Sequence, residues 1–487
     1  MEEPSVMRIN YRALVATFLL LALIPFVLTS ASLDEIIQTA YGSSEEMKRY
    51  ELDKKNTELT VSIGEAPEEL GISVSSGEVS AEFQPKTGNY QFGTTGTATT
   101  FTLPNDGKTA ITVSTGPVYY TTNSNDYTLK PSVSATHSFL YGEDSDNRST
   151  LLNKQSALLG NYTYQSNLIQ FENSILSQIQ GLLTNEKSIN ETMRSIVVQE
   201  KGMSDALALK TLSKDSVAYQ ELENSLSRLE STLASLTSNQ ELLESQYTQL
   251  TSLPWEGLPS IREPNLAFEK NPNGNTSVAL KALALDLAKE DLKLAKAALT
   301  NKTLQVNGGT NVSSVNPVSI ATGRVNSISG TVGADFTAKN YTVGTSVNGS
   351  YNLDTGDFTP TLTVRGSWNN NATQLTERLN IQKLENSAML ASISYNDALQ
   401  EYLYTASSIQ SQRASWLLEY ALLKSTISYN GKVLEQQEAL FAKGLTTKSS
   451  VDNARFTVGV DAYEKALTLI KGLVLENSIR NLQIQGR

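Results

Sequence analysis

The chain of 487 residues contains no cysteine and one histidine, His137. Without cysteine, the protein has no disulfide bonds, no thiolate metal ligands, no cysteine nucleophile and no lipid-modified N-terminal cysteine. A single histidine cannot complete a histidine-based zinc site, and any Ser-His-Asp triad would depend on His137 alone. The sequence therefore predicts no catalytic residues, no metal site, no cofactor-binding site and no enzymatic activity.

Positive charge is also scarce, because 39 Lys and Arg residues face 50 Asp and Glu residues, for a net charge of −11. Nucleic-acid binding needs a basic face that releases counterions from phosphates, so nucleic acid is not an expected partner. No glycine-rich Walker-type loop with its lysine occurs, so any energy source must come from another protein.

Long apolar runs are limited to the N-terminus, where mostly apolar residues extend from Ala13 to Val27. Arg8 and Arg12 precede this run, and small residues follow it up to Ser32, which is typical of a secretory signal peptide. A membrane anchor is the alternative, but the run falls short of the roughly 20 residues that a spanning helix needs. We expect a signal peptide over residues 1–31.

Two segments alternate strictly between apolar and polar residues, which predicts two-faced β-hairpins over about 109–141 and about 341–368. In the second, Asp354 to Asp357 form a favourable turn. Soluble half-buried sheets show the same alternation. Aromatic residues near the strand ends resemble the interfacial girdles of membrane barrels, and we predict membrane-interface roles for Tyr119, Tyr127, Tyr141, Tyr341, Tyr351 and Trp368.

Four such strands cannot close a membrane pore within one chain, because the smallest membrane barrels use about eight strands. Oligomerisation must therefore complete the barrel. His137 falls on the apolar side of its strand, where a packing or lipid-interface role is favoured over a catalytic one.

Long segments without proline predict helices over about 149–201, about 205–251, about 373–443 and about 447–484. Leucine recurs every seven residues in the second of these, which is typical of a coiled-coil seam, at Leu222, Leu229, Leu236, Leu243 and Leu250. The third has a similar row at Tyr402, Ile409, Trp416 and Leu423. A helix of about seventy residues would be about 100 Å long, which indicates a fibre or a tube.

Each half of the chain has the same order of elements, which predicts two internal repeats over 32–252 and 276–487, joined by an irregular connector over 253–275. Shorter helices are expected over about 43–62 and about 276–303. The segments 70–103 and 310–335 are β-rich, and the sequence leaves open whether they extend strands, form surface loops or add edge strands.

Two short segments carry a resemblance to a known family. Ser32 to Ala40 resembles the opening of the TolC-type outer-membrane factor family, and Phe441 to Arg455 resembles that family's helical hairpin tip. Gly444 suits the left-handed position that ends a helix, and Thr446 or Thr447 can cap the next helix. Glu200 to Asp205 is the counterpart in the first half.

The resemblance implies a mixed α/β membrane protein. Three chains with four strands each would form a twelve-stranded β-barrel, continued by a long α-helical coiled-coil tunnel in the periplasm. Such a homotrimer would be the outer-membrane exit duct of a tripartite efflux pump or type I secretion system. It would contact outer-membrane lipid, a periplasmic adaptor protein and an inner-membrane pump. The resemblance implies adaptor contacts at the tips, formed by Gly202, Met203, Ser204, Gly444, Leu445 and Thr446.

One position departs from the family's pattern. The family often has an aspartate six residues after the tip glycine, where this chain has Ser450 and Ala208. Ser450 and Asp452 are therefore only weak candidates for the periplasmic aperture. The alternative function, a secreted coiled-coil adhesin or structural filament, shares the heptads and the signal peptide but gives no reason for paired amphipathic hairpins.

Overall fold

The computed structural model describes residues 31–65, 69–86, 88–104, 108–116, 118–121, 126–141, 146–314, 325–368 and 374–484. The predicted signal peptide lies outside these residues, apart from Ala31. The chain divides into a helical unit (residues up to Asp53, Thr163–Asn271 and Leu403–Ile484) and a sheet unit (Lys54–Tyr162 and Pro272–Tyr402). No helix within the described residues is both long and apolar enough to cross a membrane.

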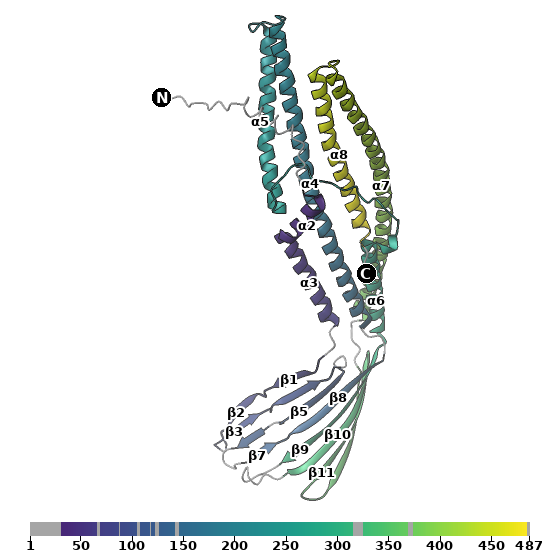
Figure 1. Ribbon diagram of the computed structural model, residues 1–487. Coiled ribbons are helices and arrows are strands. Elements are labelled where there is room, and N and C mark those ends of the chain that lie inside the picture. The colour runs from purple at the N-terminus through teal and green to yellow at the C-terminus, as the bar shows by residue number, and fades with distance from the viewer. Residues whose placement is uncertain are drawn as a thin grey trace. The chain divides into compact units, whose positions relative to one another are not determined.

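Four long helices form two antiparallel hairpins (Figure 1). All of α5 and α8, and most of α4, belong to the helical unit together with the second part of α7. The first hairpin consists of α4 (Asp146–Ala208) and α5 (Val217–Thr251), and the second of α7 (Gln374–Ala442) and α8 (Lys448–Leu482). The short helix α2 (Leu33–Ser43) begins with a capping box in which Ser32 and Glu35 satisfy each other's backbone N–H groups. Long helices occupy the expected segments, but α4 continues past residue 201 to Ala208 and α5 begins only at Val217.

Apolar side chains from α2, α4, α5 and α8 form the main core of the helical unit. Leu182 and Leu183 of α4 are fully buried there. A second cluster joins α7, α8 and the connector, and Trp416 of this cluster donates from Nε1 to the Thr468 carbonyl at 2.8 Å. Tyr402, Ile409 and Trp416 are 4%, 4% and 7% exposed, which confirms that their seven-residue spacing is a packing seam.

The leucine row of α5 is half-buried, whereas most residues beside it on the helix are exposed. It faces α4, because side-chain amides of α4 reach the α5 backbone at Leu222 and Leu243. One hairpin therefore covers part of this seam, and further apolar surface of the row remains open to solvent in the single chain.

Within the described residues, the sheet unit combines helical segments with twelve strands in one sheet. Most of α3 (Glu45–Glu65), all of α6 (Thr276–Ala297) and the beginnings of α4 and α7 belong to it. Ion pairs hold α6 to these beginnings, namely Arg148 to Asp291 and Lys296 to Glu385. A 3-10 turn, η1 (Pro272–Gly274), precedes α6, whose N-cap is Asn275.

The strands are β1 (Gly71–Ser75), β2 (Val79–Gln84), β3 (Asn89–Thr94), β4 (Ala98–Thr102), β5 (Thr109–Ser114), β6 (Val118–Thr121), β7 (Asp126–Leu129), β8 (Ser132–Tyr141), β9 (Lys302–Ser314), β10 (Val325–Ala338), β11 (Tyr341–Asn352) and β12 (Phe358–Trp368). All of their pairings are antiparallel. The two predicted hairpins are present as β5 to β8 and as β11 with β12.

The expectation of four strands per chain is wrong. Residues 71–84 pair with 89–102 in a single register, interrupted only between β1 and β2 and between β3 and β4. Likewise β5 with β6, and β7 with β8, follow one another along two more long strands. The first half of the chain therefore supplies four long strands, and β9 to β12 supply four more. The segments 70–103 and 310–335, which the sequence left unplaced, contain most of the additional strands.

An aligned row of glycines crosses the first half of the sheet at Gly77, Gly96 and Gly116. A Cβ at Gly96 would lie 2.0 Å from the Gly116 carbonyl oxygen, and a Cβ at Gly116 would lie 1.9 Å from that of Lys130. Both residues have positive φ, at 89° and 65°, which side chains disfavour. This geometry is that of stacked glycine β-bulges.

Candidate conduit surfaces

The register of the sheet places apolar residues from neighbouring strands on the same face. Val347 of β11 lies opposite Leu362 of β12 and Val332 of β10, and Val113 of β5 lies opposite Val133 of β8. Each strand alternates, so the polar residues fall on the other face. The apolar face includes Ile72, Val74, Phe101, Ile111, Phe139, Leu304, Val306, Ile328, Phe336, Val343 and Val364.

This apolar face is solvent-exposed in the single chain. Val332, Leu362 and Val364 are 66%, 66% and 70% exposed. An exposed apolar surface that continues across this many strands exceeds what a monomeric soluble protein ordinarily carries, and it marks a surface that contacts another apolar phase.

Four of the six predicted interface aromatics lie at the ends of this face. Tyr341 pairs with Trp368 at the end next to α7, and Tyr141 is the last residue of β8. Tyr351 lies beside Phe358 at the opposite end of the strands. These four aromatic side chains, Tyr141, Tyr341, Tyr351 and Trp368, are 44% to 71% exposed. The two ends are about 34 Å apart at roughly 3.4 Å per residue.

The register of the sheet shifts by one residue near Gly116. From Ser114 to Val118 the chain advances four residues, while its partner strand moves from Ser132 to Leu129, a step of three. This extra residue puts Tyr120, and not Tyr119, opposite Tyr127. This shift interrupts the strict alternation expected over about 109–141.

The opposite face of the sheet is lined by serine, threonine, asparagine and glutamine. Thr361 and Thr363 of β12 face Asn348 and Ser346 of β11, and Thr100 is 2.9 Å from Thr112 through their hydroxyl oxygens. His137 lies on the apolar face, where its ring meets Phe139 edge-on and its Nδ1 is 2.6 Å from the Thr109 hydroxyl. The structure thus gives His137 a packing environment, as the alternation predicted.

The second helical tip is at the predicted place. Gly444 has a φ of 72°, the Leu445 N–H donates to the Leu440 carbonyl at 2.9 Å, and the Gly444 N–H donates to the Phe441 carbonyl at 2.9 Å. These two bonds form a Schellman motif. Thr447 is the N-cap of α8, and its hydroxyl accepts from the Ser450 N–H. Leu445 is 71% exposed at the end of the hairpin.

The first helical tip is not at the predicted place. Gly202, Met203 and Ser204 lie inside α4, and Met203 is only 7% exposed. The chain turns later, where Lys210 has a φ of 57° and the Thr211 N–H donates to the Ala206 carbonyl at 3.0 Å. The sequence-based prediction relied on a glycine at Gly202, whereas Lys210 occupies the left-handed position of this Schellman motif.

Both tips lie at the same end of the helical unit. Contacts between α4 and α8 run antiparallel, from Asn173 with Asn477 to Arg194 with Phe456. The C-terminal end of α4 and the N-terminal start of α8 therefore point the same way. Exposed apolar side chains gather there on both hairpins, since Leu209 and Val217 are 74% and 71% exposed on the first.

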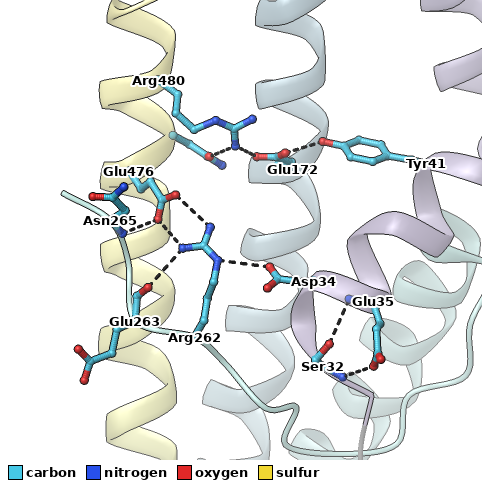
Figure 2. A network of polar contacts seen from close by, with 11 residues as sticks. Ser32, Asp34, Glu35, Tyr41, Glu172, Arg262, Glu263, Asn265, Glu476 and Arg480 are labelled. Carbon is cyan, nitrogen blue, oxygen red and sulfur yellow. Dashed lines mark hydrogen bonds and ion pairs between the residues drawn. The ribbon is translucent and has the colours of Figure 1, made fainter. Parts of the chain in front are cut away.

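A polar network ties the connector to α2, α4 and α8 (Figure 2). Arg262 of the connector donates to both oxygens of Glu476 at 2.7 and 3.0 Å, and its Nε lies 3.4 Å from Asp34 of α2. Glu172 of α4 accepts from the Tyr41 hydroxyl at 2.6 Å and also pairs with Arg480. Burial and the hydrogen bond to Glu172 raise the pKa of Tyr41.

Glu186 is a half-buried carboxylate further along α4. It accepts from Trp255 of the connector and, at 3.3 Å, from Gln240 of α5. Burial raises the pKa of Glu186. On the outside of the unit, hydrogen bonds from Lys424 and Tyr420 lower the pKa of Glu263. These contacts fasten the connector to three of the long helices.

No protein-family model matches the chain, and no curated protein matches its sequence. Solved outer-membrane channels match its structure. MtrE of Neisseria gonorrhoeae in its open state has a TM-score of 0.51 and 11% identity, covering 94% of this chain and 90% of that one. The CmeC outer-membrane channel of Campylobacter jejuni has a TM-score of 0.51 and 10% identity, covering 93% and 86%. CusC, a transmembrane channel, has a TM-score of 0.50 and 10% identity, covering 93% of each chain.

The fold is that of a TolC-type outer-membrane channel. At these low identities the likeness concerns the course of the backbone. The two weak aperture candidates lie at the start of α8. Ser450 is engaged with the Thr447 cap, and Asp452 is half-buried in the following turn.

Proposed function

We propose that the protein is an outer-membrane exit duct, a passive conduit for efflux or secretion. The observation that carries this proposal is the two-faced sheet: a continuous exposed apolar face backed by a face rich in hydroxyl and amide side chains. The apolar face fits the hydrocarbon of the outer membrane, whose core is about 30 Å thick, and its aromatic ends fit the two interfaces. The polar face suits a water-filled lumen.

The sheet has two open edges that favour assembly of several copies. All eleven residues of β12 and all five residues of β1 are exposed, and within the described residues each of these strands pairs on one side only. A lipid-facing sheet cannot leave backbone groups unpaired. Because eight long strands alternate in direction, β12 of one copy and the first strand of the next are antiparallel, so copies can join edge to edge.

We infer a homotrimer, as the resemblance to TolC-type channels implies, but with a barrel of more than the twelve strands expected from that resemblance. Eight long strands from each of three chains would give twenty-four strands, twice the number expected from the sequence. The long helices, with their half-covered seam on α5, would continue this barrel as a coiled-coil tunnel in the periplasm. The two internal repeats fit the equal supply of four long strands and one long hairpin per half.

The helical tips are the proposed contacts for a periplasmic adaptor, which would link the duct to an inner-membrane pump. Exposed Leu445 with Gly444 and Thr446 forms one contact. On the other hairpin the contact moves from Gly202, Met203 and Ser204 to the turn after α4, with Leu209 and Val217. Ser450 and Asp452 follow the second tip directly and are the candidate residues of the periplasmic aperture.

Single-channel conductance of the purified oligomer in planar bilayers, with its mass measured in parallel, tests the proposal. Discrete ion-conducting events from an oligomer of three chains are expected. A folded, membrane-inserted oligomer that never conducts, even after both tips are altered to open the helical end, would contradict a conduit.

A further inference from the structure

The polar face of the sheet carries an ion pair between Asp335 and Arg365. Across β1, β4, β5 and β8 to β12, as far as the structure describes them, the polar face bears two charged side chains, Asp335 of β10 and Arg365 of β12. Their neighbours on this face are uncharged, such as Thr337, Ser346, Thr363 and Ser367. On the described part of these strands, a passing ion therefore meets no charged side chain on this face other than the two members of this pair.

The two side chains meet across the intervening strand. Arg365 donates from Nε to Asp335 Oδ1 at 3.0 Å, and a terminal guanidinium nitrogen donates to Asp335 Oδ2. This fork-like geometry fixes the orientation of the guanidinium plane. Residue 344 of β11 lies between them and is a glycine. A Cβ there would be 2.0 Å from Asp335 Oδ1 and 2.7 Å from Arg365 Nε. The ion pair can therefore form only because residue 344 has no side chain.

The two partners differ in exposure. The Asp335 side chain is 15% exposed, whereas that of Arg365 is 66% exposed. Asp335 is thus recessed against the sheet, while Arg365 presents its charge to the space above the polar face. Arg365 lies three residues before Trp368, so the pair is about 10 Å from the end of the sheet that joins α7, at roughly 3.4 Å per residue.

We propose that Asp335 and Arg365 set the charge selectivity of the conduit. This rests on the proposed function, in which the polar face lines the lumen. Arg365 is the group that meets anionic solutes, and Asp335 is a positioning residue that holds the guanidinium and balances its charge. With several copies, the pairs form a ring at one level of the pore, where charged side chains govern which ions pass.

Reversal potentials under a salt gradient across planar bilayers test this role. Asp335→Asn leaves Arg365 unbalanced and is expected to shift the cation-to-anion permeability ratio toward anions. Arg365→Gln is expected to shift it toward cations. A unit charge about 5 Å away in water changes the local concentration of a monovalent ion about fourfold, in opposite directions for cations and anions, so each permeability ratio should shift by about sixteenfold. The double variant should return close to the wild-type ratio, and Asp357→Asn, which removes a carboxylate from the exposed turn before β12, should leave the ratio unchanged.

The absence of cysteine provides a second route that does not depend on folding of the charge variants. Thr363→Cys places a thiol beside Arg365 on the polar face, and Val364→Cys places one on the apolar face. A negatively charged, water-soluble thiosulfonate added to assembled channels should shift the ratio toward cations in the first and change nothing in the second.

The outcomes separate the two proposals. A wild-type oligomer that does not conduct would reject the conduit itself. A conducting wild type whose ratio moves in the same direction, or not at all, in Asp335→Asn and Arg365→Gln would reject the pair as the selectivity element. If Asp335→Asn and Arg365→Gln do not assemble, the Thr363→Cys channels serve instead. An unchanged cation-to-anion permeability ratio after thiosulfonate modification of Thr363→Cys would also reject the pair as the selectivity element.

Discussion

In the first half of the sheet, three of the four long strands are interrupted at aligned glycines, whereas β9 to β12 run unbroken over 11 to 14 residues. The helical hairpins differ in a similar way, because one tip uses Gly444 in the left-handed position and the other uses Lys210. Both halves nevertheless present an apolar face on the sheet and an exposed turn at the tip. The comparison teaches that one architecture tolerates different local solutions, provided that backbone geometry is kept.

The largest effect should come from filling the glycine row. Gly116→Val puts a branched side chain at positive φ against the Lys130 carbonyl oxygen, and we expect the free energy of unfolding to fall by about 3 kcal/mol. Gly366→Ala in the unbroken half is the matched control, since a Cβ there meets no atom within 4 Å. Urea unfolding of the detergent-folded protein, followed by strand circular dichroism, measures both. Equal midpoints would show that the row is not a structural requirement.

A smaller effect is expected where the connector joins the two halves. Arg262→Gln leaves Glu476, whose side chain is 12% exposed, without its bidentate partner. We expect a loss of about 2 kcal/mol, less than for a fully buried pair because Arg262 is half exposed. Arg455→Gln, which breaks an exposed pair within the second hairpin, should cost at most about 0.5 kcal/mol. The melting temperature of Arg262→Gln should therefore be lower than that of Arg455→Gln. Similar melting temperatures would show that the Arg262–Glu476 pair contributes no more to stability than an exposed pair.

Exchanging the residues at the two tips sharpens the comparison of the hairpins. Lys210→Gly should stabilise the first hairpin by about 1 kcal/mol, because glycine accepts positive φ without strain. Gly444→Lys should destabilise the second hairpin by a similar amount. Far-ultraviolet circular dichroism during thermal unfolding measures both shifts. If the two substitutions shift the melting temperature in the same direction, the two tips do not share the Schellman geometry.

The smallest effect concerns pH. Because burial raises the pKa of Glu186 in the folded unit, its contribution to stability is complete below the unfolded pKa and is lost as pH rises through the folded pKa. Glu186→Gln remains neutral, so we expect it to lose less stability than the wild type between acidic and neutral pH. Glu230→Gln, at an exposed position of α5, is the control. Parallel pH profiles for wild type and Glu186→Gln would contradict the prediction.

The sequence alone determined the long helices, the two-faced strands and the second tip. Heptads such as Leu222 to Leu250, alternation such as Tyr341 to Tyr351, and the sequence around Gly444 are local signals, each read from neighbours along one chain. The resemblance to TolC-type channels, drawn from two short segments, agrees with the fold.

Only the tertiary structure decided the number of strands, the register shift near Gly116 and the place of the first tip. Strand pairing is non-local, so residues 71–84 became recognisable as strands through their partners at 89–102. The bulge at Gly116 changes the alternation, and its one-residue shift is visible only in the register with β7 and β8. Lys210 adopts a conformation that its residue type disfavours, because the packing of α4 against α5 and α8 fixes where the chain must turn.

The pairing of Asp335 with Arg365 has the same origin. The two residues are 30 positions apart in the sequence, and no local pattern connects them. The meander of β10, β11 and β12 brings them to one level of one face, and Gly344 leaves the space between them. Sequence determines which side chains a strand offers to each face, whereas the register between strands decides which of them meet.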